Sequence, residues 1–187
     1  MKNIVVQYID KPIQYTGGEL RSHYIYEKFD LLGDALVSFA GPCEVKLASM
    51  VDLEDVKSNS PIYSENMLHF LAEFYELSLS ATVFAQRLLM SLMLEEFHRR
   101  KIYSVIRRGD DLYEEDAKLS VSIATSSVTS TLIHAGINIS SRNTPVKTKG
   151  LQDFGVDSQE FAKNILKAFK IEFETSYQAI CKVRSVI

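Results

Sequence analysis

Apolar and polar residues alternate along two neighbouring stretches of the chain, a pattern of period two that predicts β-strands. In residues 118–126 one face carries larger, mostly apolar side chains, and the other face carries small ones, namely Ser120, Ser122, Ala124 and Ser126. In residues 130–140 isoleucine and alanine alternate with a second set of small or polar residues, namely His134, Gly136, Asn138 and Ser140. Each predicted strand therefore has one apolar face and one small, polar face.

Further strands are predicted by similar patterns elsewhere in the chain, at residues 3–9, 34–40, 43–49 and 103–108, with a return strand beginning at Leu112. Residues 66–75 also alternate with period two, which favours a strand, although an apolar helical face fits the same stretch.

Glycine and proline mark the ends of several of these elements. The turn at Asp10-Lys11-Pro12 predicts that residues 13–16 pair back on the first strand as a hairpin, which Gly17-Gly18 then ends. In the same way, Gly41-Pro42 predicts the end of the strand at residues 34–40.

Helices are expected where the spacing of apolar residues changes. The pattern predicts a short helix at 18–29, a helical turn at 52–56 and a long helix at 80–100. A final helix begins near Asp157, because Glu160 follows it at the spacing of a capping box. An apolar residue recurs every four positions along this last helix, which predicts that one face of it contacts the sheet.

The order of these elements indicates the fold class. Strands and helices are mixed without strict βαβ alternation, which predicts an α+β fold with a mixed, mostly antiparallel sheet and helices packed on one face. A length of 187 residues suits a single domain, residues 1–187, and 46% apolar residues can supply its core.

Charge and cysteine content limit the partners and the cellular compartment that we expect for this protein. The formal net charge is −3, so the chain lacks the basic excess of a nucleic-acid-binding protein, and no nucleic-acid partner is expected. The apolar stretch at the N-terminus is too short to span a membrane. Cys43 and Cys181 alone do not make a disulfide framework. We therefore expect a cytoplasmic protein with no membrane partner; the sequence does not decide between a monomer and a homo-oligomer.

The small, polar faces of the two alternating strands predict a ligand site. Solvated sheet faces usually carry Lys, Glu and Thr, whereas these faces carry serine, alanine and glycine. Small side chains let a ligand approach the backbone closely. We predict that Ser120, Ser122 and Asn138 form the floor of a cleft, with His134 on the same face. The alternative is a sheet whose second face is simply solvated.

The segment that joins these strands to the preceding part of the chain resembles a motif of the biotin and lipoate protein ligases. The run from Gly109-Asp110-Asp111-Leu112-Tyr113 to Lys118-Leu119-Ser120 is similar to their Asn-Asp-(Leu/Ile)-Tyr, a short turn, and Lys-(Ile/Leu)-(Ser/Gly)-Gly. Ala135–Ile139 resembles the Gly-Ile-Asn-Val of biotin ligases, and Asn66-Met67-Leu68 resembles the Gly-Asn-Leu strand of lipoate ligases. The resemblance covers residues 66–140 and implies a ligase-like catalytic domain.

Over its whole length the chain also resembles a family of small, uncharacterised prokaryotic proteins known mainly from archaea. This second resemblance rests on Leu20-Arg21-Ser22-His23, Met50–Asp55 and Lys118–Ser122. It implies no function.

The ligase resemblance implies roles for individual residues. Lys118 would be the catalytic residue, neutralising the carboxylate of a small acid and the α-phosphate of ATP as an acyl-adenylate forms. Asp110 and Asp111 would place Mg²⁺, which prefers oxygen ligands. Asn138 would lie in the wall of the cleft. Without the resemblance, Lys118 is a solvated turn lysine and the two aspartates form a hairpin turn.

One part of the ligase pattern is missing. Lipoate ligases carry an Arg-Arg-x-x-Gly-Gly-Gly loop and biotin ligases a Gly-Arg-Gly-x-x-Gly loop, but here the corresponding segment is Val56-Lys57-Ser58-Asn59-Ser60-Pro61-Ile62-Tyr63. Gly17-Gly18 with Arg21 and His23 is a candidate replacement for binding the acid or the phosphates. Two hypotheses follow: an enzyme of acyl-adenylate formation or acyl transfer, or a non-catalytic descendant that binds a ligand or a protein.

Two other constellations have simpler explanations. Cys43 could be a nucleophile with His23, His69 or His134 as its base, but a buried structural cysteine is the better interpretation. Glu95-x-x-His98 is one Glu-x-x-His pair on a helix, and a di-iron site needs a second such pair. We therefore interpret it as a solvated helix end.

Overall fold

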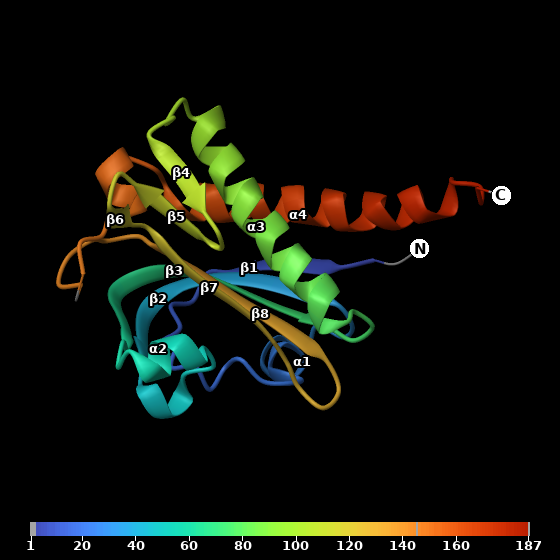
Figure 1. Ribbon diagram of the computed structural model, residues 1–187, viewed down its shortest axis with the longest axis horizontal. Helices are drawn as coiled ribbons and strands as arrows, with labels where there is room; N and C mark the ends of the chain where they lie inside the picture. Colours follow the sequence, from blue (N-terminus) through green and yellow to red (C-terminus); the bar gives the residue numbers. More distant parts are fainter. Residues whose placement is uncertain (1–2, 145, 187) are drawn as a thin grey trace.

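A five-stranded sheet lies at the centre of the molecule (Figure 1). The structure is a computed structural model and describes residues 3–144 and 146–186. The strand order is β1-β2-β3-β8-β7, formed by Val5–Ile9, Ala35–Val45, Ile62–Phe74, Thr131–Asn138 and Ser120–Ser126. β1 and β2 are parallel and the other neighbours antiparallel. The predicted mixed, mostly antiparallel sheet is confirmed, as is the strand at residues 66–75.

A second, three-stranded sheet continues from the long helix. Its strands are β4, β5 and β6, formed by Val105–Arg108, Asp111–Glu114 and Ala117–Lys118. β6 leads directly into the edge strand β7 of the main sheet. The small sheet therefore holds the ligase-like motif at one edge of the main sheet.

Two long helices pack on one face of the main sheet, as predicted (Figure 1). α3 spans Leu79–Arg99 and begins at Ser78, whose hydroxyl accepts a hydrogen bond from the Ala81 amide. α4 spans Ser158–Cys181 and begins at Asp157, whose carboxylate accepts one from the Glu160 amide. These caps satisfy backbone N–H groups that the first turn of a helix leaves without partners.

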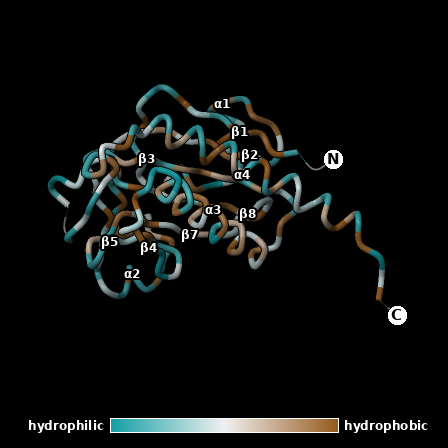
Figure 2. The backbone as a smooth tube through the Cα atoms, turned by 90° about the horizontal axis from the view of Figure 1, so that it is seen from above, coloured by the Kyte–Doolittle hydropathy of each residue, from teal (hydrophilic) through white to brown (hydrophobic). Residues whose placement is uncertain are grey.

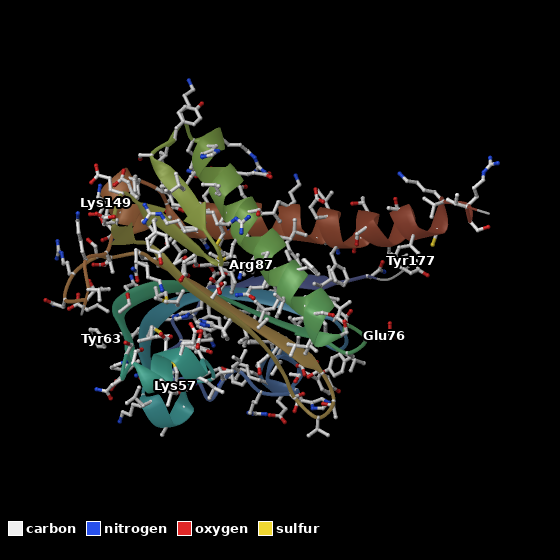
Figure 3. All side chains as sticks on the ribbon, in the orientation of Figure 1. Lys57, Tyr63, Glu76, Arg87, Lys149 and Tyr177 are labelled. Carbon is white, nitrogen blue, oxygen red and sulfur yellow. The ribbon has the colours of Figure 1, made fainter. Side chains whose placement is uncertain are left out.

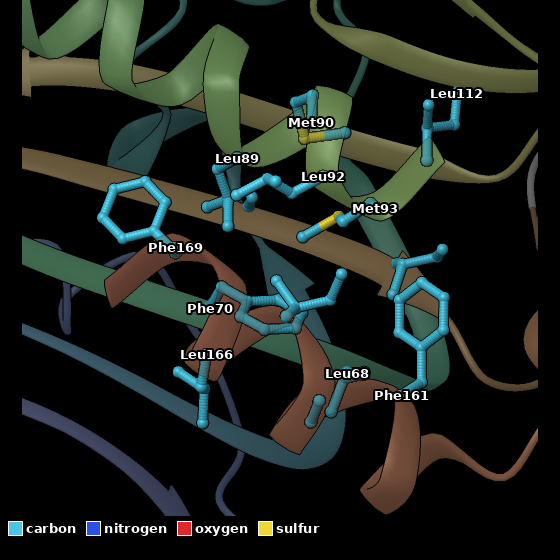
Figure 4. Packing of buried hydrophobic residues seen from close by; sticks show 14 of the residues in the cluster. Leu68, Phe70, Leu89, Met90, Leu92, Met93, Leu112, Phe161, Leu166 and Phe169 are labelled. Carbon is cyan, nitrogen blue, oxygen red and sulfur yellow. The ribbon is translucent and has the colours of Figure 1, made fainter. Parts of the chain in front are cut away.

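The main hydrophobic core fills the space between these helices and the sheet (Figure 4). Leu89 and Met93 of α3 and Phe161 and Phe169 of α4 are fully buried there, against Phe70 of β3. Because this face is filled with packed side chains, a ligand can reach the sheet only from its other face or from its edges.

The opposite face is partly covered by the chain between β1 and β2, which includes α1 (Tyr24–Phe29). The predicted hairpin at residues 13–16 is wrong: the Ile13 amide donates to the Ala40 carbonyl, and Tyr15 bridges Cys43. The cause is the parallel pairing of β1 with β2, which needs a crossover connection rather than a tight turn.

Gly41-Pro42 does not end the second strand, contrary to the prediction. β2 continues to Val45, and its register against β3 shifts between Gly41 and Cys43, so the proline lies at a bulge, where the sheet tolerates it. The glycine is needed for packing: a Cβ added there would lie 2.0 Å from the Ile13 carbonyl oxygen. The predicted strand 43–49 is therefore the end of β2, followed by a 3-10 turn at Leu47–Ser49.

Two other short elements border the site. The helical turn predicted at 52–56 is α2, Leu53–Lys57, capped by Asp52. A 3-10 turn at Leu151–Phe154 precedes α4. The predicted helix at 18–29 is shorter than expected, because His23 adopts a left-handed conformation with φ 64° directly before α1.

The far end of α4 extends beyond the sheet (Figures 1 and 2). Phe161 and Phe169 of its apolar stripe are buried, whereas Tyr177, which Figure 3 labels on this extension, is 40% exposed and Cys181 is exposed. The predicted contact with the sheet thus holds only for the first half of the helix. Among residues 3–144 and 146–186, no helix combines the length and apolarity that crossing a bilayer requires.

Candidate functional site

Lys118 is fixed by backbone hydrogen bonds on two sides. Its N–H donates to the Lys147 carbonyl (3.1 Å), and its own carbonyl accepts from the Lys149 amide (3.2 Å). The next residue, Leu119, donates to the Leu112 carbonyl of β5 (2.8 Å). The lysine backbone is therefore held between the small sheet and the loop that leads to α4.

The Lys118 side chain forms an ion pair with a nearly buried carboxylate. Its Nζ lies 2.7 Å from Asp111 Oδ2, and the Asp111 side chain is only 13% exposed. Ser120 Oγ donates to Asp111 Oδ1 (3.1 Å) and accepts from the Leu112 amide (2.8 Å). Ser120 thus holds the aspartate in place for the lysine.

Burial and charge act against each other in this pair. Burial raises the pKa of Asp111, although Lys118 and Ser120 oppose the rise. Burial also disfavours the charged lysine, but Asp111, Tyr113 and Asp55 outweigh it and raise the pKa of Lys118. Lys118 is therefore a cation at neutral pH, and its ion pair with the 13% exposed Asp111 side chain distinguishes it from a turn lysine that contacts only water.

Two cavities meet at Lys118. The first, which we name the His134 cavity, lies between α2, the chain at 15–20 and strand β7, and its lining includes Tyr15, Asp55, Lys118, Val121 and His134. The second, the Asn138 cavity, is lined by residues that include Tyr63, Lys118, Val121, Asn138 and Thr148. Both share Asp55, Ile62, Lys118 and Val121, so they form two arms around one lysine.

The His134 cavity is acidic. Five carboxylates line it, and these are Asp52, Glu54, Asp55, Asp110 and Asp111. Among the described residues that line either cavity, Lys118 is the single lysine or arginine. Burial raises the pKa of Asp55, and the neighbouring Asp52 adds to this effect. A polyanionic ligand would therefore need a cation to accompany it into this arm.

His134 lies at the inner wall of the cavity that bears its name and is 3% exposed. Its Nε2 lies 3.1 Å from Nδ1 of the fully buried His69, and His69 Nε2 lies 3.3 Å from the Gly41 carbonyl oxygen. The Tyr15 ring stacks on His134 with centroids 3.7 Å apart. Burial lowers the pKa of His69 to about 4, and burial together with His69 lowers that of His134 well below its usual value.

The predicted cleft floor is wrong in one respect: its residues do not share a face. Ser120 and Ser122 pair with Ile137 and Ala135, so they lie on the helix-covered face. His134 and Asn138 belong to the opposite face, together with Val121. The sequence pattern was read correctly within each strand, but the register between the strands places the polar face of one beside the apolar face of the other.

Ser122 connects the long helix to the ligase-like turn. Its hydroxyl donates to the Asp110 carbonyl (2.7 Å) and accepts from Gln86 Nε2 of α3 (2.7 Å). Arg87, labelled on α3 in Figure 3, lies 3.9 Å from the Asp110 carboxylate. Ser122 borders the His134 cavity and Ser120 borders the Asn138 cavity, so both serines still lie beside the candidate ligand site.

Arg21 and His23 lie away from Lys118 and line neither cavity. Arg21 pairs with Glu27 (2.5 Å), and the His23 amide donates to the buried Glu73 carboxylate (2.8 Å). Glu73 lies next to the C-terminal end of β3, six residues along the strand from Met67, which pairs with Asn138. The structure therefore does not bring the predicted Gly17-Gly18, Arg21 and His23 set together around Lys118; of these residues only Gly17 lines a cavity there.

The simpler explanations hold for the other constellations. Burial raises the pKa of Cys43 to about 12, so the thiol stays protonated, and the interpretation as a buried structural cysteine is confirmed. Within the described residues there is no group of three or more His, Cys, Asp or Glu side chains that could hold a metal. A magnesium ion commonly uses one or two carboxylates and substrate phosphates, so the role predicted for Asp110 and Asp111 stays a prediction.

Sequence reasoning did not assign three residues to the site: Tyr15 and Asp55, which line the His134 cavity, and His69, which hydrogen-bonds to His134. Tyr15 lies in a segment that the sequence pattern predicts to be a hairpin, and Asp55 lies in the helical turn predicted at 52–56. His69 lies on a predicted strand. It comes close to His134 only because β3 pairs with β8, where His69 lies opposite Gly136, two residues from His134.

Comparisons with known proteins agree with this geometry. A family model described as "Domain of unknown function (DUF366)" matches residues 4–184. An uncharacterised protein of Methanocaldococcus jannaschii is 34% identical over 154 residues, which is 80% of this chain and 70% of that protein. A solved protein of unknown function from Pyrococcus horikoshi is 35% identical with a TM-score of 0.92, covering 99% of this chain and 100% of the other.

More distant solved structures share the fold. The biotin protein ligase from Aquifex aeolicus, in complex with biotin and ATP, has a TM-score of 0.57 and 15% identity over 90% of this chain and 69% of its own. P. falciparum LipL1, in complex with lipoate, has a TM-score of 0.59 and 12% identity over 99% of this chain and 65% of its own. The expected biotin and lipoate ligase-like fold is confirmed by these neighbours.

Proposed function

Because the chain belongs to the family described as "Domain of unknown function (DUF366)", whose name assigns no activity, we propose a function from the site: it binds a small carboxylic acid at Lys118 and activates it as an acyl-adenylate. The observation that carries this proposal is the position of Lys118 where two cavities meet, as the single lysine or arginine among the described residues that line them. A ligand made of two parts joined by a negatively charged linkage fits such a site.

The acid and the nucleotide would each occupy one arm. The biotin ligase neighbour binds biotin and ATP, and the LipL1 neighbour binds lipoate, so the same fold holds both ligand classes in other proteins. In this chain the two arms share Lys118 and Val121, which would place the junction of acid and nucleotide next to the ammonium.

The proposed reaction is balanced with ATP as co-reactant. A carboxylate oxygen of the acid forms a bond to the α-phosphorus of ATP. The bond from that phosphorus to the bridging oxygen breaks, and pyrophosphate leaves with the electron pair. Lys118 supplies positive charge where the transition state gathers negative charge, and Asp111 with Ser120 holds the lysine in position. Asp110 and Asp111 would supply oxygen ligands for Mg²⁺, and the charge of the ion would offset the acidic lining.

A non-catalytic binding protein is the second candidate, and the acidic lining favours it. Five carboxylates against one lysine in the His134 cavity repel a triphosphate unless a metal accompanies it. The segment Val56–Tyr63 also offers no glycine-rich loop whose amides could cradle phosphates. On this reading the cavity holds a ligand, and Lys118 is a binding contact only.

Exchange of pyrophosphate into ATP separates the two candidates. The protein is incubated with ATP, Mg²⁺, labelled pyrophosphate and one acid from a panel of biotin, lipoate and octanoate. Label that enters ATP only with one acid supports adenylate formation, and Lys118→Met should reduce its rate by about 10²–10³. Thermal shift with the same ligands runs in parallel, because a ligand that binds the native state raises Tm. Acid binding without exchange would support the binding protein.

A further inference from the structure

The two histidines at the inner end of the His134 cavity form a hydrogen-bonded chain whose proton positions follow from its partners. A carbonyl oxygen can only accept, so His69 Nε2 carries the hydrogen that points at Gly41. A neutral imidazole has one N–H, so His69 Nδ1 is a bare acceptor. His134 Nε2, 3.1 Å away, must then be the donor.

This series of hydrogen bonds leaves His134 Nδ1 as an acceptor without a hydrogen. Both rings are buried, which keeps them neutral at pH 7. Among the residues that the structure describes, none hydrogen-bonds to His134 Nδ1, and this atom is not one of the fully buried side-chain atoms that lack a partner, so it is open to the cavity that the 3% exposed residue lines. An acceptor that has no partner in the protein and opens into a cavity is available to a hydrogen-bond donor on a ligand.

Neighbouring side chains hold the His134 ring in one orientation and determine which ligand group suits its Nδ1. Tyr15 stacks on the His134 ring at an interplanar angle of 8°, so the ring cannot rotate freely. The five carboxylates of the lining are acceptors as well, and Lys118 is the single lysine or arginine among the described residues that line this cavity. This end of the cavity is therefore matched to a ligand group that donates hydrogen bonds.

We propose that the His134 cavity recognises the end of its ligand remote from Lys118 by an N–H or O–H group that donates to His134 Nδ1. The ligand class is then an acid that carries a urea, amide or hydroxyl donor, and an acid with a plain hydrocarbon or disulfide ring is disfavoured. The proposal rests on the proposed function only for the carboxylate end; the donor end is independent of it.

His69 is a positioning residue in this scheme. It does not touch the ligand, but its Nδ1 holds the proton of His134 on Nε2 and so keeps Nδ1 of His134 bare. In His69→Phe that constraint is lost, and His134 should populate the form with N–H at Nδ1. The change would invert the preference of the cavity from donors to acceptors, which loss of packing alone would not do.

The proton positions can be measured directly in the wild-type protein. Long-range ¹H–¹⁵N correlation spectra of ¹⁵N-histidine-labelled protein at pH 7 should show protonated Nε2 and bare Nδ1 for both buried rings, and a mixture of forms for His134 in His69→Phe. A wild-type His134 that is protonated at Nδ1 would overturn the proposal, and this result needs no variant to fold.

Binding is tested with two small probes that lack a carboxylate. Imidazolidin-2-one has two N–H donors, and its 1,3-dimethyl derivative has none. The first should shift the His134 Nδ1 signal and bind about tenfold more tightly, the ratio expected for one lost hydrogen bond. His134→Phe should abolish the difference. Equal binding of both probes, or no shift at His134, refutes the proposal. Because the probes carry no acid, a failure here is distinct from an absence of pyrophosphate exchange.

Discussion

Replacing Lys118 with methionine should destabilise the protein through the aspartate that it leaves behind. Asp111 is held by Ser120 and has a side chain only 13% exposed. Removing one partner of a buried ion pair costs about 3–5 kcal/mol. Lys118 is 35% exposed, so solvent screens part of the interaction, and we expect the free energy of unfolding to fall by about 1–3 kcal/mol.

The decrease in the free energy of unfolding caused by Lys118→Met should depend on pH. Burial already raises the pKa of Asp111, and without Lys118 to oppose it the pKa rises further. An acid whose folded pKa lies above its unfolded value favours the folded state when protonated, and this advantage is lost as pH rises through the interval between the two values. Lys118→Met should therefore be less destabilised at pH 4 than at pH 7.

Urea unfolding at both pH values measures the effect, with two controls. Lys118→Met combined with Asp111→Asn removes both charges and should recover most of the loss. Lys170→Met removes a partly exposed helical ion pair with Glu174 and should cost about 0.5 kcal/mol or less. The reasoning is refuted if Lys118→Met is no more destabilising than Lys170→Met, or if the double variant is as unstable as the single one.

Three further predictions concern stability. Burial lowers the pKa values of His69 and His134, so the unfolded chain takes up protons before the folded protein does as pH falls from about 6.5 towards 4. The free energy of unfolding should therefore fall by up to about 1.4 kcal/mol per histidine per pH unit. His134→Phe should flatten this slope, which urea unfolding at a series of pH values measures. Gly41→Ala should cost about 3 kcal/mol because its Cβ would lie 2.0 Å from the Ile13 carbonyl oxygen, whereas Gly18→Ala, with an ordinary contact at 3.6 Å, should be nearly neutral in Tm; similar Tm values would contradict this. Ser122→Leu should destabilise by about 1–3 kcal/mol in the same assay, since the side chain lies under α3; an unchanged Tm would mean that this position faces open space.

Most helices and strands of this protein follow from the local sequence. Asp157 caps the last helix, as its spacing to Glu160 predicts, and the period-two stretches at residues 66–75, 118–126 and 130–140 are strands. These features depend on residues within a few positions of one another, which is why they could be predicted from the sequence. The predicted importance of Lys118 also came from a contiguous motif, and the structure places that lysine where both cavities meet.

The errors concern contacts between distant segments. Each strand's two faces were assigned correctly, but which face of one strand lies beside which face of the next depends on register, so the serines of β7 joined the helix side and His134 the open side. Residues 13–16 fit a hairpin locally, yet the sheet uses them against β2. Arg21 and His23 follow a glycine pair in sequence, but Arg21 pairs with Glu27 and the His23 amide donates to Glu73 near the C-terminal end of β3.

The sequence by itself thus determined the secondary structure, the fold class and the charged turn that carries Lys118, because propensity, capping and periodicity act over short distances along the chain. Tertiary structure alone decided that Asp111 pairs with that lysine in a nearly buried position and that His69 fixes the proton of His134 beside Tyr15. Pairs of this kind are set by strand order and register, which depend on how the whole core packs rather than on any local pattern.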